Sequence, residues 1–305
     1  MPVSTKTDSS SSKYLLPSPL DIIITSCIPE SLQDSVIPVA EMRLWTQALA
    51  PDTFPGSYLG PSLKSLQILY KQSRQQTSSQ DSQLAYYLQL VASQRFRTLP
   101  SNASSTSWCA MLIFSFSTIM FQFASQQICP IRDFDYLQTL ALLRISVDLA
   151  LVTMPYLMKS DMWPAIQLRI EKWARVLDPS VENALTELED TILAATMDNR
   201  ASTAHLRACR ALKNWAKDCG GFPWTWKDYI QWPAQIPEAF INLIAQEDDI
   251  ALLILIYWCA VLHLGPRRWF IERWPSRAAA CASSKLKENW IKLLVWPTAV
   301  FDTAT

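Results

Sequence analysis

A run of twelve apolar residues, from Ala251 to Leu262, constrains the fold of this chain more than any other feature. The run is followed by His263 and ends before Gly265-Pro266. It is too short to cross a bilayer, which needs about 20 residues, and longer than a usual strand. Because no charged or strongly polar side chain interrupts the run, a helix formed by it would have no polar face for solvent. The run predicts a helix that is buried on all sides.

Apolar residues recur at helical spacing along most of the remaining chain. Only 5 glycines occur in 305 residues, and β-branched alternation is rare, which argues against a sheet. We therefore predict an all-α fold: a disordered Ser-rich tail over residues 1–14, then one multi-helix domain over residues 15–305, with the apolar run as its central buried helix. The predicted helices are Val39–Ala50, Leu63–Gln76, Asp81–Leu99, Trp108–Ala124, Asp133–Met158, Asp161–Val176, Ser202–Asp218, Arg268–Ala282 and Glu288–Val295, with others that begin at Pro179, Pro237 and Asp249.

The spacing also predicts which faces are buried and where helices begin. Asp178-Pro179 and Asp248-Asp249 are typical of helix starts, because an aspartate caps free N–H groups and an acid stabilises the first turn. The predicted buried stripes are Leu84, Tyr87, Leu88 and Val91; Leu137, Leu140, Leu143, Val147 and Leu151; and Val181, Leu185, Leu188, Ile192 and Leu193.

Charge and cysteine usage limit the partners and the compartment. The chain has 27 basic and 27 acidic residues, which gives no general attraction to nucleic acid. Its seven cysteines are scattered, no C-x-x-C occurs, and the N-terminus lacks the pattern of a signal peptide. We expect free thiols and a nuclear or cytoplasmic location. A membrane span at Trp108–Ala124 is the alternative to a buried helix; Ser115, Ser117 and Gln122 favour the buried helix, so we expect no span.

The aromatic residues around the central helix are the main candidate site. Small-molecule sites are usually apolar pockets with a few polar anchors. The alternative is an ordinary aromatic core. The predicted ligand-binding residues are Trp258, Trp269, Phe270 and Trp274 as walls, with Tyr257, His263 and Arg268 as anchors.

Metal and catalytic sites are weaker alternatives. His205 and Cys209 share one helix face, as do Cys259 and His263, so four zinc ligands would meet if the two helices faced each other. Their order along the chain is unusual for zinc, so we expect no metal and no cofactor. A nucleophilic Cys259–His263 pair lacks an acid to orient it, so no catalytic motif is recognisable.

Two charged clusters have simple interpretations. Asp248-Asp249 resembles part of the acidic motif of terpene cyclases but lacks a third acid, and a helix start explains it. The mildly basic end of the chain is expected to be a solvated face; it contains Arg267, Arg268, Arg273, Arg277, Lys285, Lys287 and Lys292.

Several short motifs, taken in order, resemble one fungal family. The early motifs are Leu84-Ala85-Tyr86-Tyr87, Phe96-Arg97, Asn102 and the helix that ends in Phe123-Ala124-Ser125. The late motifs are Trp232-Pro233, Ile236-Pro237, Phe240, Ala251 to Leu255, Val261-Leu262-His263, Arg268-Trp269-Phe270, Trp274 and Trp296-Pro297. Over residues 38–302 the chain resembles the C-terminal regulatory domain of fungal zinc binuclear cluster transcription factors of the sterol-uptake-regulator type.

The resemblance implies an all-α domain that holds a hydrophobic small molecule, such as a sterol, lipid or polyketide, and regulates transcription. The expected targets are the genes of a secondary-metabolism cluster. Members of that family usually carry a six-cysteine zinc cluster ahead of this domain. This chain has no paired C-x-x-C motif, so we expect no direct DNA binding and action through other transcription proteins. The alternative function is an enzyme or accessory factor of secondary metabolism, for example a cyclase that works by positioning its substrate in an apolar pocket.

Overall fold

The computed structural model describes residues 57–74, 79–98, 107–129, 134–164, 166–167, 176–195, 200–223 and 225–303. The predicted tail 1–14, the predicted helix Val39–Ala50 and much of Asp161–Val176 lie outside these ranges. The described residues form helices and turns, with no strand among them, and the all-α prediction is confirmed.

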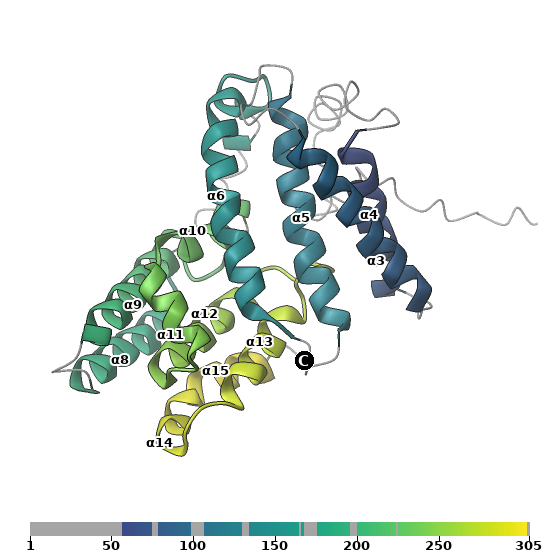
Figure 1. Cartoon of the computed structure of the whole chain (residues 1–305). Helices are drawn as coiled ribbons and strands as arrows, with labels where there is room; N and C mark the ends of the chain where they lie inside the picture. Colours follow the sequence, from purple (N-terminus) through teal and green to yellow (C-terminus); the bar gives the residue numbers. More distant parts are fainter. Residues whose placement is uncertain are drawn as a thin grey trace, which may run out of the picture.

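The helices follow one another closely along the chain (Figure 1). Most predicted helices are present with ends shifted by a few residues. The elements are α3 (Leu59–Arg74), α4 (Ser79–Arg97), α5 (Trp108–Ile128), α6 (Tyr136–Met158), α8 (Pro179–Ala195), α9 (Arg200–Asp218), α10 (Trp226–Gln235), α11 (Glu238–Ala245), α12 (Asp249–His263), α13 (Trp274–Ser283), α14 (Glu288–Ile291), the 3-10 helix η4 (Lys292–Leu294) and α15 (Val295–Asp302).

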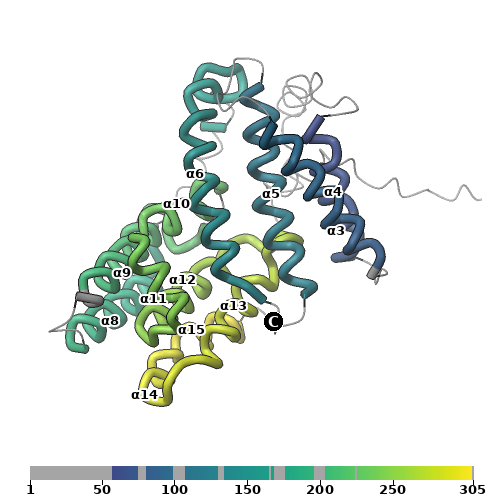
Figure 2. Tube along the Cα trace, in the orientation of Figure 1, coloured from purple at the N-terminus to yellow at the C-terminus, as the bar shows by residue number. Residues whose placement is uncertain are grey.

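The helices from α3 to α6 form one part of the molecule and those from α8 onward form another (Figures 1 and 2). The chain descends through α5 and returns through α6, and α3 packs on both α4 and α5. Helices α8, α9, α11, α13 and α15 pack on α12, and this part joins the first where α13 packs on α5 and α10 packs on α6. One continuous apolar core runs through both parts.

The predicted central helix is confirmed as α12. Every side chain from Ala251 to Leu262 is buried, and α8, α9, α11, α13 and α15 all pack on this helix. The predicted N-cap is also present: Asp248 Oδ1 accepts the N–H of Ala251 at 2.9 Å. Asp178 likewise accepts the N–H of Ser180 at 2.7 Å, as its sequence position predicts.

The predicted buried face of α4 is wrong. Leu84 and Tyr87 are 45% and 61% exposed, whereas Ala85, Gln89 and Ala92 are buried. Small alanine side chains allow α3 to approach α4 closely, and the larger side chains therefore lie on the outer side.

A buried polar junction accounts for the position of α4. Gln89 Oε1 accepts hydrogen bonds from Ser62 Oγ at 3.0 Å and Ser65 Oγ at 3.2 Å, both on α3. Its Nε2 donates to Thr118 Oγ1 on α5 at 3.1 Å. Rotating α4 to bury Leu84 would leave these buried polar groups without partners, which costs about 1–3 kcal/mol each.

Two members of the other predicted stripes are also exposed. Leu193 lies on the outer side of α8, and Leu151 on α6 is 68% exposed, because neither helix is covered on that side. The predicted helix Arg268–Ala282 begins later, at Trp274, since residues 269–273 form turns. Helix α10, which the sequence interpretation missed, begins at a capping box made by Thr225 and Asp228.

Candidate functional site

The aromatic residues predicted to form a pocket pack against one another. Trp258 stacks on Trp232 with ring centroids 4.9 Å apart and meets the edge of Trp274 at 5.9 Å. Trp274 in turn packs edge-on against Phe123 of α5 at 5.0 Å. All four rings are fully buried, so this cluster packs like an aromatic core.

The other predicted residues point in different directions. Phe270 is buried and stacks on Trp226 at 5.7 Å, while Trp269 packs edge-on against Tyr70 of α3 at 5.3 Å. Tyr257 faces the C-terminal helices, where its hydroxyl donates to the carbonyl of Leu293 at 2.9 Å.

The predicted anchor Arg268 is also buried, and its guanidinium lies over the ring of Tyr229 at 5.5 Å. Two of the seven predicted residues line surface hollows, and these hollows are different ones: His263 lines one and Trp269 another. The structure therefore does not bring the predicted group together around one cavity.

The two histidine–cysteine pairs lie at opposite ends of α12. His205 Nε2 is 2.7 Å from Asp248, which caps the start of α12, while His263 is its last residue. A helix of 15 residues is about 22 Å long, so the two imidazoles cannot share a metal ion. Within the described ranges no group of three His, Cys, Asp or Glu side chains is arranged to hold one.

Burial makes three of the cysteines poor nucleophiles. It raises the pKa of Cys209 and of Cys219 to about 12, and it raises the pKa of Cys259 as well. The thiolate is the reactive form, so these side chains stay protonated and unreactive at neutral pH.

A hollow of about 300 Å³ lies where α12 ends. We call it the α12-end hollow. Its walls come from α12, the turns that follow it, α13 and α15. Because these residues lie far apart in the sequence, spacing along the chain did not group them. The lining residues are Leu262, His263, Gly265, Pro266, Arg267, Ile271, Glu272, Arg273, Pro275, Ser276 and Phe301.

His263 is the polar side chain on the inner wall of this hollow. Its ring packs edge-on against Phe301 at 5.0 Å. Burial, together with the nearby Arg267 guanidinium, lowers the pKa of His263, so the ring is neutral at pH 7. Its Nε2 is enclosed and has no hydrogen-bond partner among the described residues.

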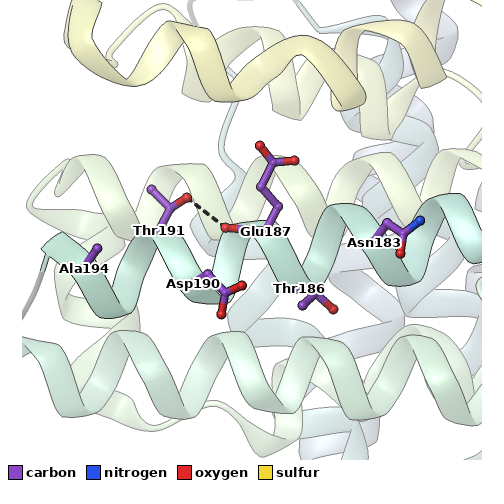
Figure 3. A pocket seen from close by; sticks show the side chains of 6 residues that line it. All are labelled: Asn183, Thr186, Glu187, Asp190, Thr191 and Ala194. Carbon is purple, nitrogen blue, oxygen red and sulfur yellow. Dashed lines mark hydrogen bonds between the residues drawn. The ribbon is translucent and has the colours of Figure 1, made fainter.

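Two other hollows differ in character. One, of about 250 Å³, lies between α3, α5 and the turn that carries Trp269. The other, of about 560 Å³, is a broad surface depression over α8, with polar side chains such as Asn183, Glu187 and Asp190 (Figure 3). A single helix supplies all of its lining residues, so it does not enclose a ligand.

An exposed apolar surface runs along α6 from Ile145 to Met158. Ile145, Leu151 and Met158 are 67%, 68% and 53% exposed, and Val152 and Met154 are exposed as well. By length and hydropathy alone, α5 and α6 are the two described helices that could cross a membrane, but α5 is mostly buried in the protein and α6 mostly is not.

No family model, no curated protein and no solved structure matches this chain.

Proposed function

We propose that this chain is a helical protein-binding domain of a regulatory protein, and that it binds an apolar helix of a partner on the exposed surface of α6. The observation that carries the proposal is the segment from Leu149 to Met158, ten residues without a charge, with large apolar side chains in solvent. Contiguous apolar surface of this kind is typical of interaction sites.

The spacing of these side chains suits a helical partner. Leu151, Met154 and Met158 lie at positions i, i+3 and i+7, so they form one stripe along α6. Side chains spaced in this way form a ridge that can pack into the groove between side chains of another apolar helix. Methionine side chains adapt their shape to a partner, which favours such a role.

The proposed role in regulation rests on the resemblance to fungal zinc-cluster regulators. Binding through another transcription protein is the mode that a chain without a recognised DNA-binding module would use. The aromatic side chains around Trp258 are fully buried and pack against one another. This packing favours a domain that binds a protein partner over one that holds a ligand within the aromatic cluster.

Site-specific photo-crosslinking tests the surface. A photoreactive amino acid at Leu151 or Met158 should crosslink to the same protein in cells, and one at Asp190, an exposed position on α8, should not. The purified partner should then lose affinity for a Leu151→Ser/Met158→Ser variant. Equal crosslinking at Asp190 would refute the proposal, and crosslinks to a second copy alone would show self-association instead.

Gene deletion separates regulation from catalysis. Loss of transcripts of a metabolic gene cluster supports a regulator. Intact transcripts with an accumulated precursor would instead support the enzyme alternative.

A further inference from the structure

We propose that the α12-end hollow binds a small molecule that carries an acidic group on a compact apolar body. The acid would lie between Arg267 and Arg273, and the apolar body would lie against Leu262, Ile271 and Phe301. This site is separate from the α6 surface and does not depend on the function proposed for it.

The two arginine side chains that line the hollow are available to bind an anion. Arg267 and Arg273 are exposed, and within the described part of the chain neither guanidinium has an ion pair or a hydrogen bond. Other cations of the basic end have partners at the start of α12: Lys285 pairs with Glu247, and Lys287 with Asp249.

Arg277 on α13 also has hydrogen-bond partners. Its guanidinium donates to the carbonyl of Gln127 at 2.7 Å and to that of Cys129. The mildly basic end of the chain is therefore only partly a solvated face, because Arg267 and Arg273 face a hollow.

The charge balance of the hollow favours an anion. Glu272 is the single carboxylate among its lining residues, against two guanidinium groups, and His263 is neutral. The net charge is therefore +1. Arginine is well suited to bind a carboxylate, because its planar fork can donate two parallel hydrogen bonds.

His263 contributes its ring to the wall of the hollow, while its Nε2 is enclosed by protein. Buried polar atoms almost always have a hydrogen-bond partner. His263 Nε2 has none among the described residues, and its ring belongs to the wall of the hollow. Because this nitrogen is closed to water, it is closed to a ligand in the hollow as well, so His263 offers the ligand a ring surface and not a hydrogen bond.

The walls of the hollow are held in place from several sides. Gln127 on α5 accepts the N–H of Arg273 at 2.6 Å and donates to the carbonyl of Trp269 at 3.0 Å, which fixes the turn before α13. The volume of about 300 Å³ is at the lower limit of small-molecule sites, so the ligand class is a compact aryl or medium-chain carboxylic acid.

The test uses 2-naphthoate as the probe and its neutral amide, 2-naphthamide, as the matched comparison. Calorimetric titration should show millimolar or tighter binding of 2-naphthoate, with affinity for the amide lower by about tenfold. An Arg267→Gln/Arg273→Gln variant should lose the preference for the acid. Arg207→Gln, which removes an exposed arginine from α9, should not change it.

Nuclear magnetic resonance identifies the binding site directly, because the chain has only 2 histidines. The probe should shift the ring nitrogen resonances of His263, assigned with His263→Gln, and leave those of His205 unchanged. Equal binding of acid and amide, no binding, or equal shifts of both histidines would overturn the proposal. Both arginine variants change exposed side chains, and thermal unfolding confirms that they remain folded.

Discussion

His205 on α9 and Asp248 at the start of α12 are joined by a short contact of 2.7 Å between Nε2 and Oδ1. The same carboxylate oxygen accepts the N–H of Ala251. Burial raises the pKa of Asp248, but the hydrogen bonds from His205 and from the backbone lower it more, so the pKa lies below its usual value. One side chain therefore both caps the central helix and fixes α9 against it.

Asp248→Asn should make stability depend less on pH. Asparagine also caps helices, so the substitution removes mainly the charge. A lowered pKa in the folded state gives stability that is present above the unfolded pKa and is lost as pH falls through the folded value. We expect the wild type to be more stable by about 1–2 kcal/mol at neutral pH, with the difference shrinking below about pH 4.

Urea unfolding of both proteins between neutral and acidic pH measures this difference. Asp190→Asn, which changes an exposed carboxylate on α8, serves as the control and should give a small difference. A difference between wild type and Asp248→Asn that stays constant with pH would contradict the role of the charge.

Two buried tryptophans should respond differently to replacement by phenylalanine. Trp215 Nε1 donates to the carbonyl of Asp228 at 2.7 Å, whereas Trp258 Nε1 has no partner among the described residues. Both side chains are fully buried, so the change in volume is the same. Trp215→Phe should therefore lower the free energy of unfolding by about 1 kcal/mol more than Trp258→Phe. Chemical denaturation measures the free energy of unfolding of both variants. Equal losses of stability would show that the Trp215 hydrogen bond does not account for a difference between the two sites.

Gly265 should not tolerate a side chain. A Cβ atom there would lie 2.5 Å from the carbonyl oxygen of Pro223 and 3.0 Å from that of Leu262, both backbone atoms that cannot move aside easily. Gly265→Ala should lower stability by about 1–3 kcal/mol. Gly60→Ala, where the nearest atom is 3.8 Å away, should change it by less than about 0.5 kcal/mol. Thermal unfolding of the pair checks this, and equal melting temperatures would contradict it.

Iodoacetamide should label the described cysteines unevenly. Cys209, Cys219 and Cys259 are buried with raised pKa values, so they should react only when the protein unfolds. Cys281 is partly exposed and should react in the native protein. Mass spectrometry of digested samples, with and without urea, separates the two groups. Rapid native labelling of Cys259 would show that α12 is more accessible than its packing indicates.

The α6 surface should contribute little to the stability of the isolated chain. Leu151→Ser replaces an exposed side chain and should change the free energy of unfolding by less than about 0.5 kcal/mol. Leu143→Ala, on the buried side of the same helix, should cost about 2–5 kcal/mol. Denaturant unfolding compares them; a large loss for Leu151→Ser would mean that this surface is part of the folded core.

Local sequence determined the burial of α12 and the starts of α8 and α12. The apolar run of α12 predicts complete burial because it has no polar side, and Asp178 and Asp248 act within three residues of their own positions. These features depend on neighbours along the chain, so one sequence is sufficient to predict them.

Tertiary structure decided which faces are covered and which residues meet. On α4 the sequence favoured Leu84 and Tyr87 as part of the buried face, but the polar junction at Gln89 fixes a rotated orientation that leaves both exposed. The α12-end hollow combines residues from α12 with Phe301 of α15, and the spacing within one helix carries no information about such a contact. Burial of α6 likewise depends on whether another element packs on it, because apolar spacing shows only that a face could be buried and not what covers it.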